Sequence, residues 1–137
     1  PQRQSVILDT GSTKTAFPCD PCDECGKYLK YHESGPFIPT QSSTYVLVES
    51  NPGWSAHYSE GDGWEANIVK DMTWLGGTAV NDIFGADQRS IFFKFGCMTK
   101  LTGLFVTQLA DGIMGLGFAS SESYVSAPPC FSRGHGI

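Results

Sequence analysis

Hydrophobic and polar residues alternate with a period of two along most of this chain, in short runs that are typical of half-buried β-strands. Clusters of Gly, Pro, Asn, Asp and Ser separate the runs, as in Asn51-Pro52-Gly53 and Gly76-Gly77. No segment has ten or more residues of clean helical spacing, and residues 120–125 are expected to form one helical turn at most. The pattern predicts a single all-β, mostly antiparallel domain with strands at 5–8, 44–49, 54–59, 65–75, 78–84, 91–97 and 112–116.

The neighbouring runs within residues 54–75 are expected to form a long hairpin. Glu60-Gly61-Asp62-Gly63 lies between them, and it is a strong turn signal because Gly tolerates positive φ and Asp bonds its own backbone. Tyr58 would lie near the tip of the hairpin, where it could close over a bound extended peptide. The alternative is an ordinary surface hairpin in which Tyr58 is half buried.

Length, composition and charge narrow the class of protein. A chain of 137 residues suits one domain with a real hydrophobic core. Its net charge of −5, with no basic cluster, argues against nucleic acid or an acidic membrane surface as a partner. No apolar stretch approaches the length that spans a bilayer, so any membrane anchor would lie outside this sequence. The chain does not begin with Met, and we expect its natural amino terminus to be missing.

The cysteines of the chain are Cys19, Cys22, Cys25, Cys97 and Cys130. Such a number in a short chain favours an oxidising compartment, either outside the cell or in the endomembrane and vacuolar system. The first three follow the spacing C-x2-C-x2-C, which also raises metal binding as a hypothesis. An iron–sulfur run would need its next ligand at Leu29, and a zinc site would need His32 or Cys97 as its fourth ligand. We therefore favour disulfides and expect no metal or other cofactor. The connectivity stays open, and reduced thiols or a small redox module are the alternatives.

One polar turn carries the most informative chemistry. The apolar run Val6-Ile7-Leu8 predicts a short buried strand, and it leads directly into Asp9-Thr10-Gly11-Ser12. Gly11 lets the backbone bend and lets another segment approach closely, so the turn holds the Asp9 carboxylate in a fixed place. The hydroxyls of Thr10 and Ser12 are donors that can position this carboxylate.

Two further segments follow this turn in a consistent order and spacing. They are Tyr58-Ser59-Glu60-Gly61-Asp62-Gly63-Trp64 and Ala110-Asp111-Gly112-Ile113-Met114-Gly115-Leu116-Gly117. Together with the Asp9 turn they resemble the amino-terminal lobe of a pepsin-like aspartic protease, over residues 1–117. The cysteines within residues 19–26, together with Ser42-Ser43-Thr44 and Phe95-Gly96-Cys97, are most similar to the nepenthesin and plasmepsin V type. Residues 118–137 fit the pattern poorly and are expected to form a divergent or truncated tail.

The resemblance implies a barrel-like β lobe, one of two in a bilobal fold, and an endopeptidase that activates water between two aspartates. In that family each lobe donates one Asp, and the two carboxylates share a proton because like charges about 3 Å apart cannot both ionise. The implied partners are a polypeptide substrate and the carboxy-terminal lobe of the same parent protein. The implied site residues are Asp9 as the catalytic carboxylate, Thr10, Gly11 and Ser12 as its supports, and Tyr58, Ser59, Glu60 and Gly61 as a flap that binds substrate. The strand Ile113-Met114-Gly115 is expected to pack against the Asp9 turn.

The other aspartates are expected to have structural or solvent-exposed positions. Asp111-Gly112 lacks the intervening Thr or Ser of the catalytic turn and falls in the same lobe, so its carboxylate is expected to bond the local backbone. Asp71, Asp82 and Asp87 lie at predicted strand ends or turns and are expected to be solvated.

The sequence therefore supplies half of a two-aspartate site. Either a second lobe follows Ile137, or two copies pair as in the retroviral protease arrangement, and we favour the former. On this view the polypeptide by itself hydrolyses nothing. The runner-up hypothesis is a non-catalytic protease-like module for binding or inhibition, and the intact Asp9 turn argues against it.

Two departures from the family's pattern bear on the flap. Ala16 stands where pepsin has the Trp that bonds the flap tyrosine, so that contact is expected to be absent or replaced. Trp64-Glu65-Ala66 lacks the small Gly that is usual in the returning flap strand. Both departures affect the expected geometry of the flap and the substrate preference.

Overall fold

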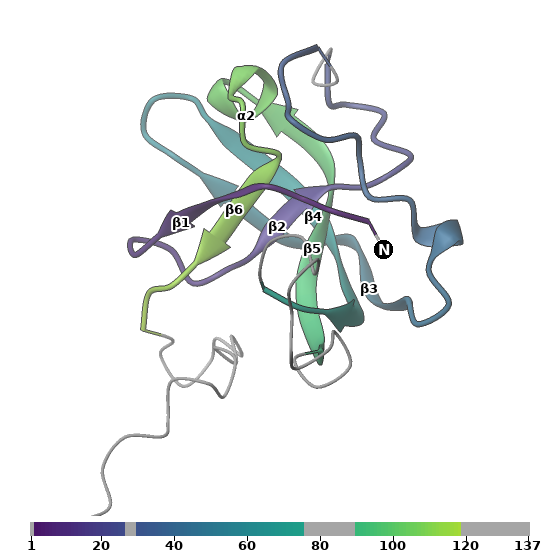
Figure 1. The fold of residues 1–137 in the computed structure, drawn as a ribbon. Helices are drawn as coiled ribbons and strands as arrows, with labels where there is room; N and C mark the ends of the chain where they lie inside the picture. Colours follow the sequence, from purple (N-terminus) through teal and green to yellow (C-terminus); the bar gives the residue numbers. More distant parts are fainter. Residues whose placement is uncertain (1, 27–29, 76–89, 119–137) are drawn as a thin grey trace, which may run out of the picture.

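The computed structural model describes residues 2–26, 30–75 and 90–118, and all structural statements below concern these residues (Figure 1). The elements, in chain order, are β1 (Val6–Asp9), β2 (Ala16–Pro18), the 3-10 helix η2 (Pro39–Gln41), β3 (Val46–His57), β4 (Gly63–Thr73), β5 (Ile91–Thr102), the short helix α2 (Leu104–Thr107) and β6 (Gly112–Gly115). The predicted strand at 78–84 and the predicted helical turn at 120–125 lie outside the described residues. In the described ranges, no helix has the length and apolar character needed to cross a membrane.

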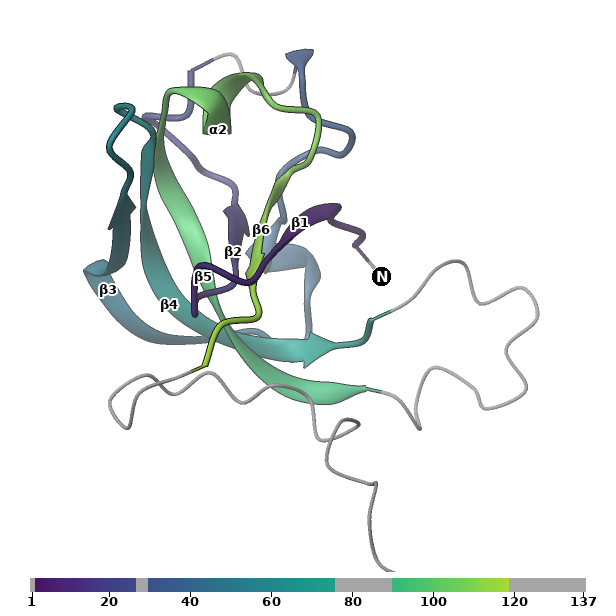
Figure 2. The same cartoon turned by 90° about the vertical axis from the view of Figure 1, so that its left-hand side faces the viewer.

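The described strands form one sheet in the order β1-β6-β2-β5-β4-β3 (Figure 1). The β1–β6 and β2–β5 pairs are parallel, whereas β2–β6, β3–β4 and β4–β5 are antiparallel. The sheet is mixed, and most of its paired residues belong to the antiparallel ladders of β3, β4 and β5. Figure 2 shows these three long strands curving together along their length. The prediction of an all-β, mostly antiparallel lobe is confirmed. The expectation that the run Val6-Ile7-Leu8 forms a buried strand is wrong, since Ile7 and Leu8 of β1 are 44% and 66% exposed.

The long hairpin expected within residues 54–75 is present, because β3 and β4 pair up to the His57–Gly63 position beside the turn. The expected break at Asn51-Pro52-Gly53 is wrong, since β3 runs through these residues as one strand of 12 residues. The register shifts between Glu49 and Trp54 instead. β3 is an edge strand, and an edge strand tolerates a proline within a bulge. A Cβ atom at Gly53 would come within 2.5 Å of the Ile68 side chain, so a larger residue in this bulge would displace that side chain.

Two short elements cannot be predicted from hydrophobic periodicity. β2 has three residues and α2 has four, which is too few for either a two-fold or a 3.6-fold pattern to emerge. β5 is also longer than expected and ends at Thr102, five residues beyond the predicted end at Cys97. These elements matter for the site, since β2 follows the Asp9 turn and α2 lies next to the tip of the hairpin.

Two disulfides join four of the five cysteines. Cys19–Cys97 connects the residue after β2 to β5 with a Cα–Cα distance of 5.2 Å, and Cys22–Cys25 closes a short loop. The prediction of disulfides is thus confirmed for these four, and Cys97 is not free to act as a zinc ligand. The Nε2 atom of His32, the other candidate fourth ligand, lies 2.8 Å from the carbonyl oxygen of Phe105. Cys130 lies outside the described residues.

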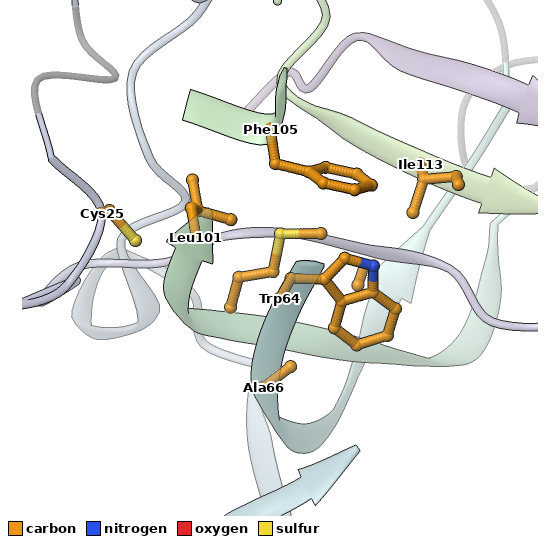
Figure 3. Packing of buried hydrophobic residues seen from close by; sticks show 8 residues of the cluster. Cys25, Trp64, Ala66, Leu101, Phe105 and Ile113 are labelled. Carbon is orange, nitrogen blue, oxygen red and sulfur yellow. The ribbon is translucent and has the colours of Figure 1, made fainter. Parts of the chain in front are cut away.

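The core has two parts, one on each face of β5. Cys97 and Met98 are adjacent in β5, point to opposite faces and belong to different clusters. Burial of one large apolar side chain stabilises a fold by about 1.5–3 kcal/mol, so each cluster contributes substantially. The first cluster, shown in Figure 3, contains Ala16, Cys25, Trp64, Ala66, Met98, Leu101, Phe105 and Ile113. The second contains Cys19, Phe37, Val69, Phe95 and Cys97.

The expectation that Asp71 is solvated is wrong. Asp71 is buried in β4, where its carboxylate accepts hydrogen bonds from the Thr44 hydroxyl and, at 2.7 Å, from the N–H of Met72. A buried carboxylate requires such donors, because an unpaired charge in the interior is strongly unfavourable. Asp82 and Asp87 lie outside the described residues.

Candidate active site

Asp9 ends β1 at the point where this strand and β6 run in parallel. Asp9 pairs with Gly115, and the N–H of Leu116 donates to the carbonyl oxygen of Asp9 at 2.7 Å. The N–H of Gly115 donates to the Lys14 carbonyl oxygen at 3.1 Å, which brings the far end of the turn onto the same strand. The prediction that Ile113-Met114-Gly115 packs against the Asp9 turn is therefore confirmed.

Close contact between β6 and the turn depends on residues without side chains. A Cβ atom at Gly115 would come within 2.6 Å of the Thr13 carbonyl carbon and 2.8 Å of the Ser12 carbonyl oxygen. A Cβ atom at Gly117 would also lie 2.8 Å from that oxygen. Backbone atoms form the obstacle in each case, so the turn can keep this position only with glycine opposite it.

The carboxylate of Asp9 is fixed by the backbone of its own turn. Its Oδ1 atom accepts a hydrogen bond from the N–H of Gly11 at 2.9 Å. The Ser12 hydroxyl is buried and has no hydrogen-bond partner in the part of the chain that is described, so it does not bond Asp9 in this state. Thr10 is exposed. The structure thus brings Asp9 and Gly11 into contact, while support from Thr10 and Ser12 stays a prediction.

The tip of the β3–β4 hairpin is a tight turn at residues 58–62. The N–H of Tyr58 donates to the Asp62 carbonyl oxygen at 2.9 Å, and the N–H of Gly61 donates to the Tyr58 carbonyl oxygen at 3.1 Å. Gly61 has a φ of 88°, as the turn signal predicts. All four residues predicted to form the flap, Tyr58, Ser59, Glu60 and Gly61, are exposed. They are therefore accessible to a ligand on this side of the lobe.

The hairpin tip is also attached to the corner between β5 and α2. Asp62 Oδ1 accepts a hydrogen bond from the N–H of Leu104, the first residue of α2, at 2.9 Å. The Thr102 hydroxyl donates to the carbonyl oxygen of Gly61 at 3.2 Å. These bonds hold the tip beside α2, and the sequence gives no indication of them.

Tyr58 links the hairpin tip to the Asp9 turn. Its ring centroid lies 5.7 Å from that of Phe105 in α2. Burial raises the pKa of Tyr58, and the negative charge of Asp9 raises it further, whereas the neighbouring Trp64 indole lowers it. Two segments that are far apart in the sequence, the Asp9 turn and the predicted flap, therefore share one electrostatic environment.

Asp111 has the structural role that was expected, but its partners are different. It is 1% exposed, and its Oδ2 accepts hydrogen bonds from the N–H of Ser5 at 2.6 Å and from the Ser5 hydroxyl at 2.9 Å. Its Oδ1 accepts from the N–H of Ser34 at 2.8 Å. These donors are distant in sequence, so the expectation of local backbone bonds is wrong. Asp111 lies at the opposite end of β1 from Asp9 and does not supply a second carboxylate to this site.

Trp64 and Phe105 are site neighbours that the sequence analysis did not identify. Trp64 was noted as the end of the segment Tyr58–Trp64 and as part of a departure from the family pattern, without a role in the site, and α2 was not predicted. The available signal was the position of Trp64 just after the hairpin turn, on the same alternating face of β4 as Ala66 and Ile68. A large aromatic residue on the inward face near a hairpin tip is placed to contact the residues of that tip.

Comparison with known proteins shows that the chain is similar to aspartic proteases. The sequence pattern of the family described as eukaryotic aspartyl protease matches residues 1–133. The chain is similar to Aspartic protease 5 of Toxoplasma gondii, with 34% identity over 86% of this chain and 14% of that protein. Candidapepsin-4 of Candida albicans is 30% identical over 89% of this chain and 26% of its own length. Aspartic protease 1 of Caenorhabditis elegans is 29% identical over 94% of this chain and 30% of its own length. The chain thus spans less than a third of each of these relatives.

Proposed function

This chain belongs to the eukaryotic aspartyl protease family, and we propose that it is part of an aspartic-type endopeptidase in which Asp9 is one of two catalytic carboxylates. The observation that carries the proposal is the position of Asp9. Its carboxylate accepts a hydrogen bond from the N–H of Gly11, in a turn that packs on β6. Its negative charge raises the pKa of Tyr58 in the exposed hairpin tip. A carboxylate fixed beside a surface hairpin is suited to act on a substrate lying between them.

The chemistry requires a second carboxylate. In a pair that shares one proton, the ionised member takes a proton from water as it attacks the scissile carbonyl, and the neutral member stabilises the developing oxyanion. This sequence holds a single Asp-Thr-Gly turn, and Asp111 is occupied by backbone donors. The second carboxylate therefore comes from outside these 137 residues, and we expect the isolated chain to be inactive.

The partner that supplies it is the carboxy-terminal lobe of the same parent protein. Large apolar side chains are exposed around the Asp9 turn, and β1 is an edge strand of the sheet that the described residues form. Large exposed apolar side chains of this kind favour association with another protein surface. The side chains concerned are Ile7 and Leu8 of β1, and Leu116 and Phe118 after β6, with exposed fractions from 44% to 103%.

The substrate is an extended polypeptide that lies between the Asp9 turn and the flap of residues 58–61. Support comes from the exposure of all four flap residues and from the ring of Tyr58, whose centroid lies 5.7 Å from that of Phe105. Two disulfides and relatives named as secreted aspartic proteases support a secreted or otherwise oxidising location, which includes the endomembrane and vacuolar system.

Substitution of Asp9 in the full-length protein tests the proposal. Asp9→Asn keeps the size of the side chain but removes the charge, and we expect it to lower the rate of acid-range cleavage of an unfolded protein by about 10³-fold or more. The matched control is Asp23→Asn, which changes an exposed aspartate and should leave the rate unchanged. Retained cleavage in Asp9→Asn would refute the assigned role. A folded wild-type protein that binds polypeptide without cleaving it would favour the non-catalytic module instead.

A further inference from the structure

Lys14 connects the Asp9 turn to the strand that leads into the predicted flap. Its backbone lies at the end of the turn, where its carbonyl oxygen accepts the hydrogen bond from the N–H of Gly115. Its side chain reaches β3, where the ammonium donates to the carbonyl oxygen of Ser55 at 3.3 Å. Ser55 is exposed and lies three residues before Tyr58. β1, which leads into the turn, and β3 are at opposite ends of the described sheet, so the contact joins two segments that the sheet does not pair.

The aromatic ring of Trp54 holds the Lys14 ammonium in this place. The ammonium lies 5.9 Å from the centroid of the ring, which is within the range of an attractive cation–π contact. Trp54 is itself fixed, because it packs against the first core cluster. A lysine side chain at a surface ordinarily samples many rotamers, and contacts on two sides reduce this freedom. The ammonium therefore has a defined position between the turn and β3.

In the part of the chain that the structure describes, no carboxylate forms a salt bridge with Lys14. Lys100 differs in this respect, because its ammonium lies 3.1 Å from a carboxylate oxygen of Glu24 and 4.0 Å from one of Glu65. The acceptor for Lys14 is one neutral carbonyl oxygen, whereas an ammonium has three N–H donors. The other donors are available to an anionic group from another molecule.

We propose that Lys14 is a specificity-determining residue that binds an acidic side chain of the polypeptide substrate. The inference rests on the proposed function, which puts the substrate between the Asp9 turn and the flap, and Lys14 joins the turn to the strand of that flap. The chain has a net charge of −5, so its overall field repels the acidic residues of a peptide. Attraction by one fixed ammonium is local, and it therefore acts at about one or two adjacent positions of the substrate.

Peptide libraries test this preference position by position. Each decapeptide library has Glu or Gln at one fixed position and is random elsewhere, and mass spectrometry locates the cleaved bond. Two quantities are measured with the full-length protein at about pH 5.5, where glutamate is ionised. They are the ratio of kcat/KM for the Glu and Gln libraries, and the ratio of their affinities for Asp9→Asn, which removes the catalytic charge. The wild type should favour Glu by about 3- to 10-fold at one or two adjacent positions.

Substitutions of Lys14 supply the decisive comparison. Lys14→Arg keeps the charge and should keep the preference, Lys14→Met should remove it, and Lys14→Glu should reverse it. Lys100→Met makes the same change in net charge at a lysine that is paired with Glu24, and it should leave the ratio unchanged. A Lys14 with a purely structural role would affect the Glu and Gln libraries alike. A ratio near one in the wild type, or a preference that Lys14→Met does not alter, would overturn the inference.

Measuring both binding and cleavage separates this inference from the proposed function. If the libraries bind with a Glu preference that depends on Lys14 but the wild type cleaves none of them, the acidic-residue site stands and the proposed function fails. If the wild type cleaves them with a ratio that does not depend on Lys14, the proposed function stands and the inference fails. A protein that neither binds nor cleaves the libraries would overturn both.

Discussion

A methyl group at position 115 has no room in this structure. Gly115 ends β6, pairs with Asp9 and donates its N–H to the Lys14 carbonyl oxygen. In Gly115→Ala the new Cβ atom would overlap the Lys14 nitrogen and approach the Ser12 carbonyl oxygen to 2.8 Å. These are backbone atoms of the turn that holds Asp9, so relief of the overlap requires the turn to move away from β6. Forcing extra volume into a packed site costs about 1–3 kcal/mol, and the lost Gly115 hydrogen bond adds about 1 kcal/mol.

Gly115→Ala should therefore lower the free energy of unfolding by about 2–4 kcal/mol, measured by denaturant unfolding of the full-length protein followed by tryptophan fluorescence. Movement of the turn should also lower kcat by up to about 100-fold, because a displacement of about 1 Å at a reacting group has an effect of that order. Gly35→Ala is the matched control, since a Cβ atom there meets nothing within 4 Å. It should leave activity unchanged and alter stability by less than about 1 kcal/mol. Equal behaviour of the two variants would refute the argument that close approach of β6 fixes Asp9.

Four further variants test other contacts. Replacing both cysteines of Cys19–Cys97, whose sequence separation is 78, by serine should lower the free energy of unfolding by about 4 kcal/mol. The same change to Cys22–Cys25, whose separation is 3, should lower it by about 1.5 kcal/mol. Urea unfolding without reductant measures both values. Asp62→Ala removes the acceptor of the Leu104 N–H and should speed limited proteolysis at the hairpin tip; an unchanged rate would contradict its attachment to α2. Asp111→Ala leaves the partly buried N–H groups of Ser5 and Ser34 without their acceptor and should destabilise the fold by about 2–4 kcal/mol. A loss under about 1 kcal/mol in the same unfolding assay would contradict its structural role.

The parts of the site that depend on neighbouring residues are predictable from the sequence. The Asp9 turn follows from an apolar run that ends in Asp-Thr-Gly-Ser, and its one observed donor to the carboxylate, the Gly11 N–H, is two residues away. The hairpin follows from the turn signal at residues 60–63 and from the alternation in β4. Both features are set by local backbone preferences and side-chain periodicity, which act without the rest of the fold.

The errors concern contacts between distant segments. Asp71 was expected to be solvated from its place in the chain, but it is buried because the Thr44 hydroxyl, 27 residues away, meets it across the fold. The backbone donors to Asp111 come from positions 77 and 106 residues away. The Asn51-Pro52-Gly53 segment has turn chemistry, yet it continues β3 because pairing with β4 on both sides of it outweighs the local preference. The contact between α2 and Tyr58 is hidden in the same way, since nothing local to either segment indicates the other.

The attachments of the hairpin tip determine how it can move away from α2. The tip accepts hydrogen bonds from the β5–α2 corner: the Asp62 carboxylate accepts from the N–H of Leu104, and the Gly61 carbonyl oxygen accepts from the Thr102 hydroxyl. Tyr58 also packs on Phe105 of α2. β4 and β5, which lead to and from this region, are interior strands of the sheet with a long shared ladder. Bending that ladder would break many hydrogen bonds at once, whereas the Asp62–Leu104 bond is single and exposed. Opening should therefore begin with loss of the Asp62 bond and separation of Tyr58 from Phe105, so that the tip moves away from α2 while the sheet beneath it stays intact.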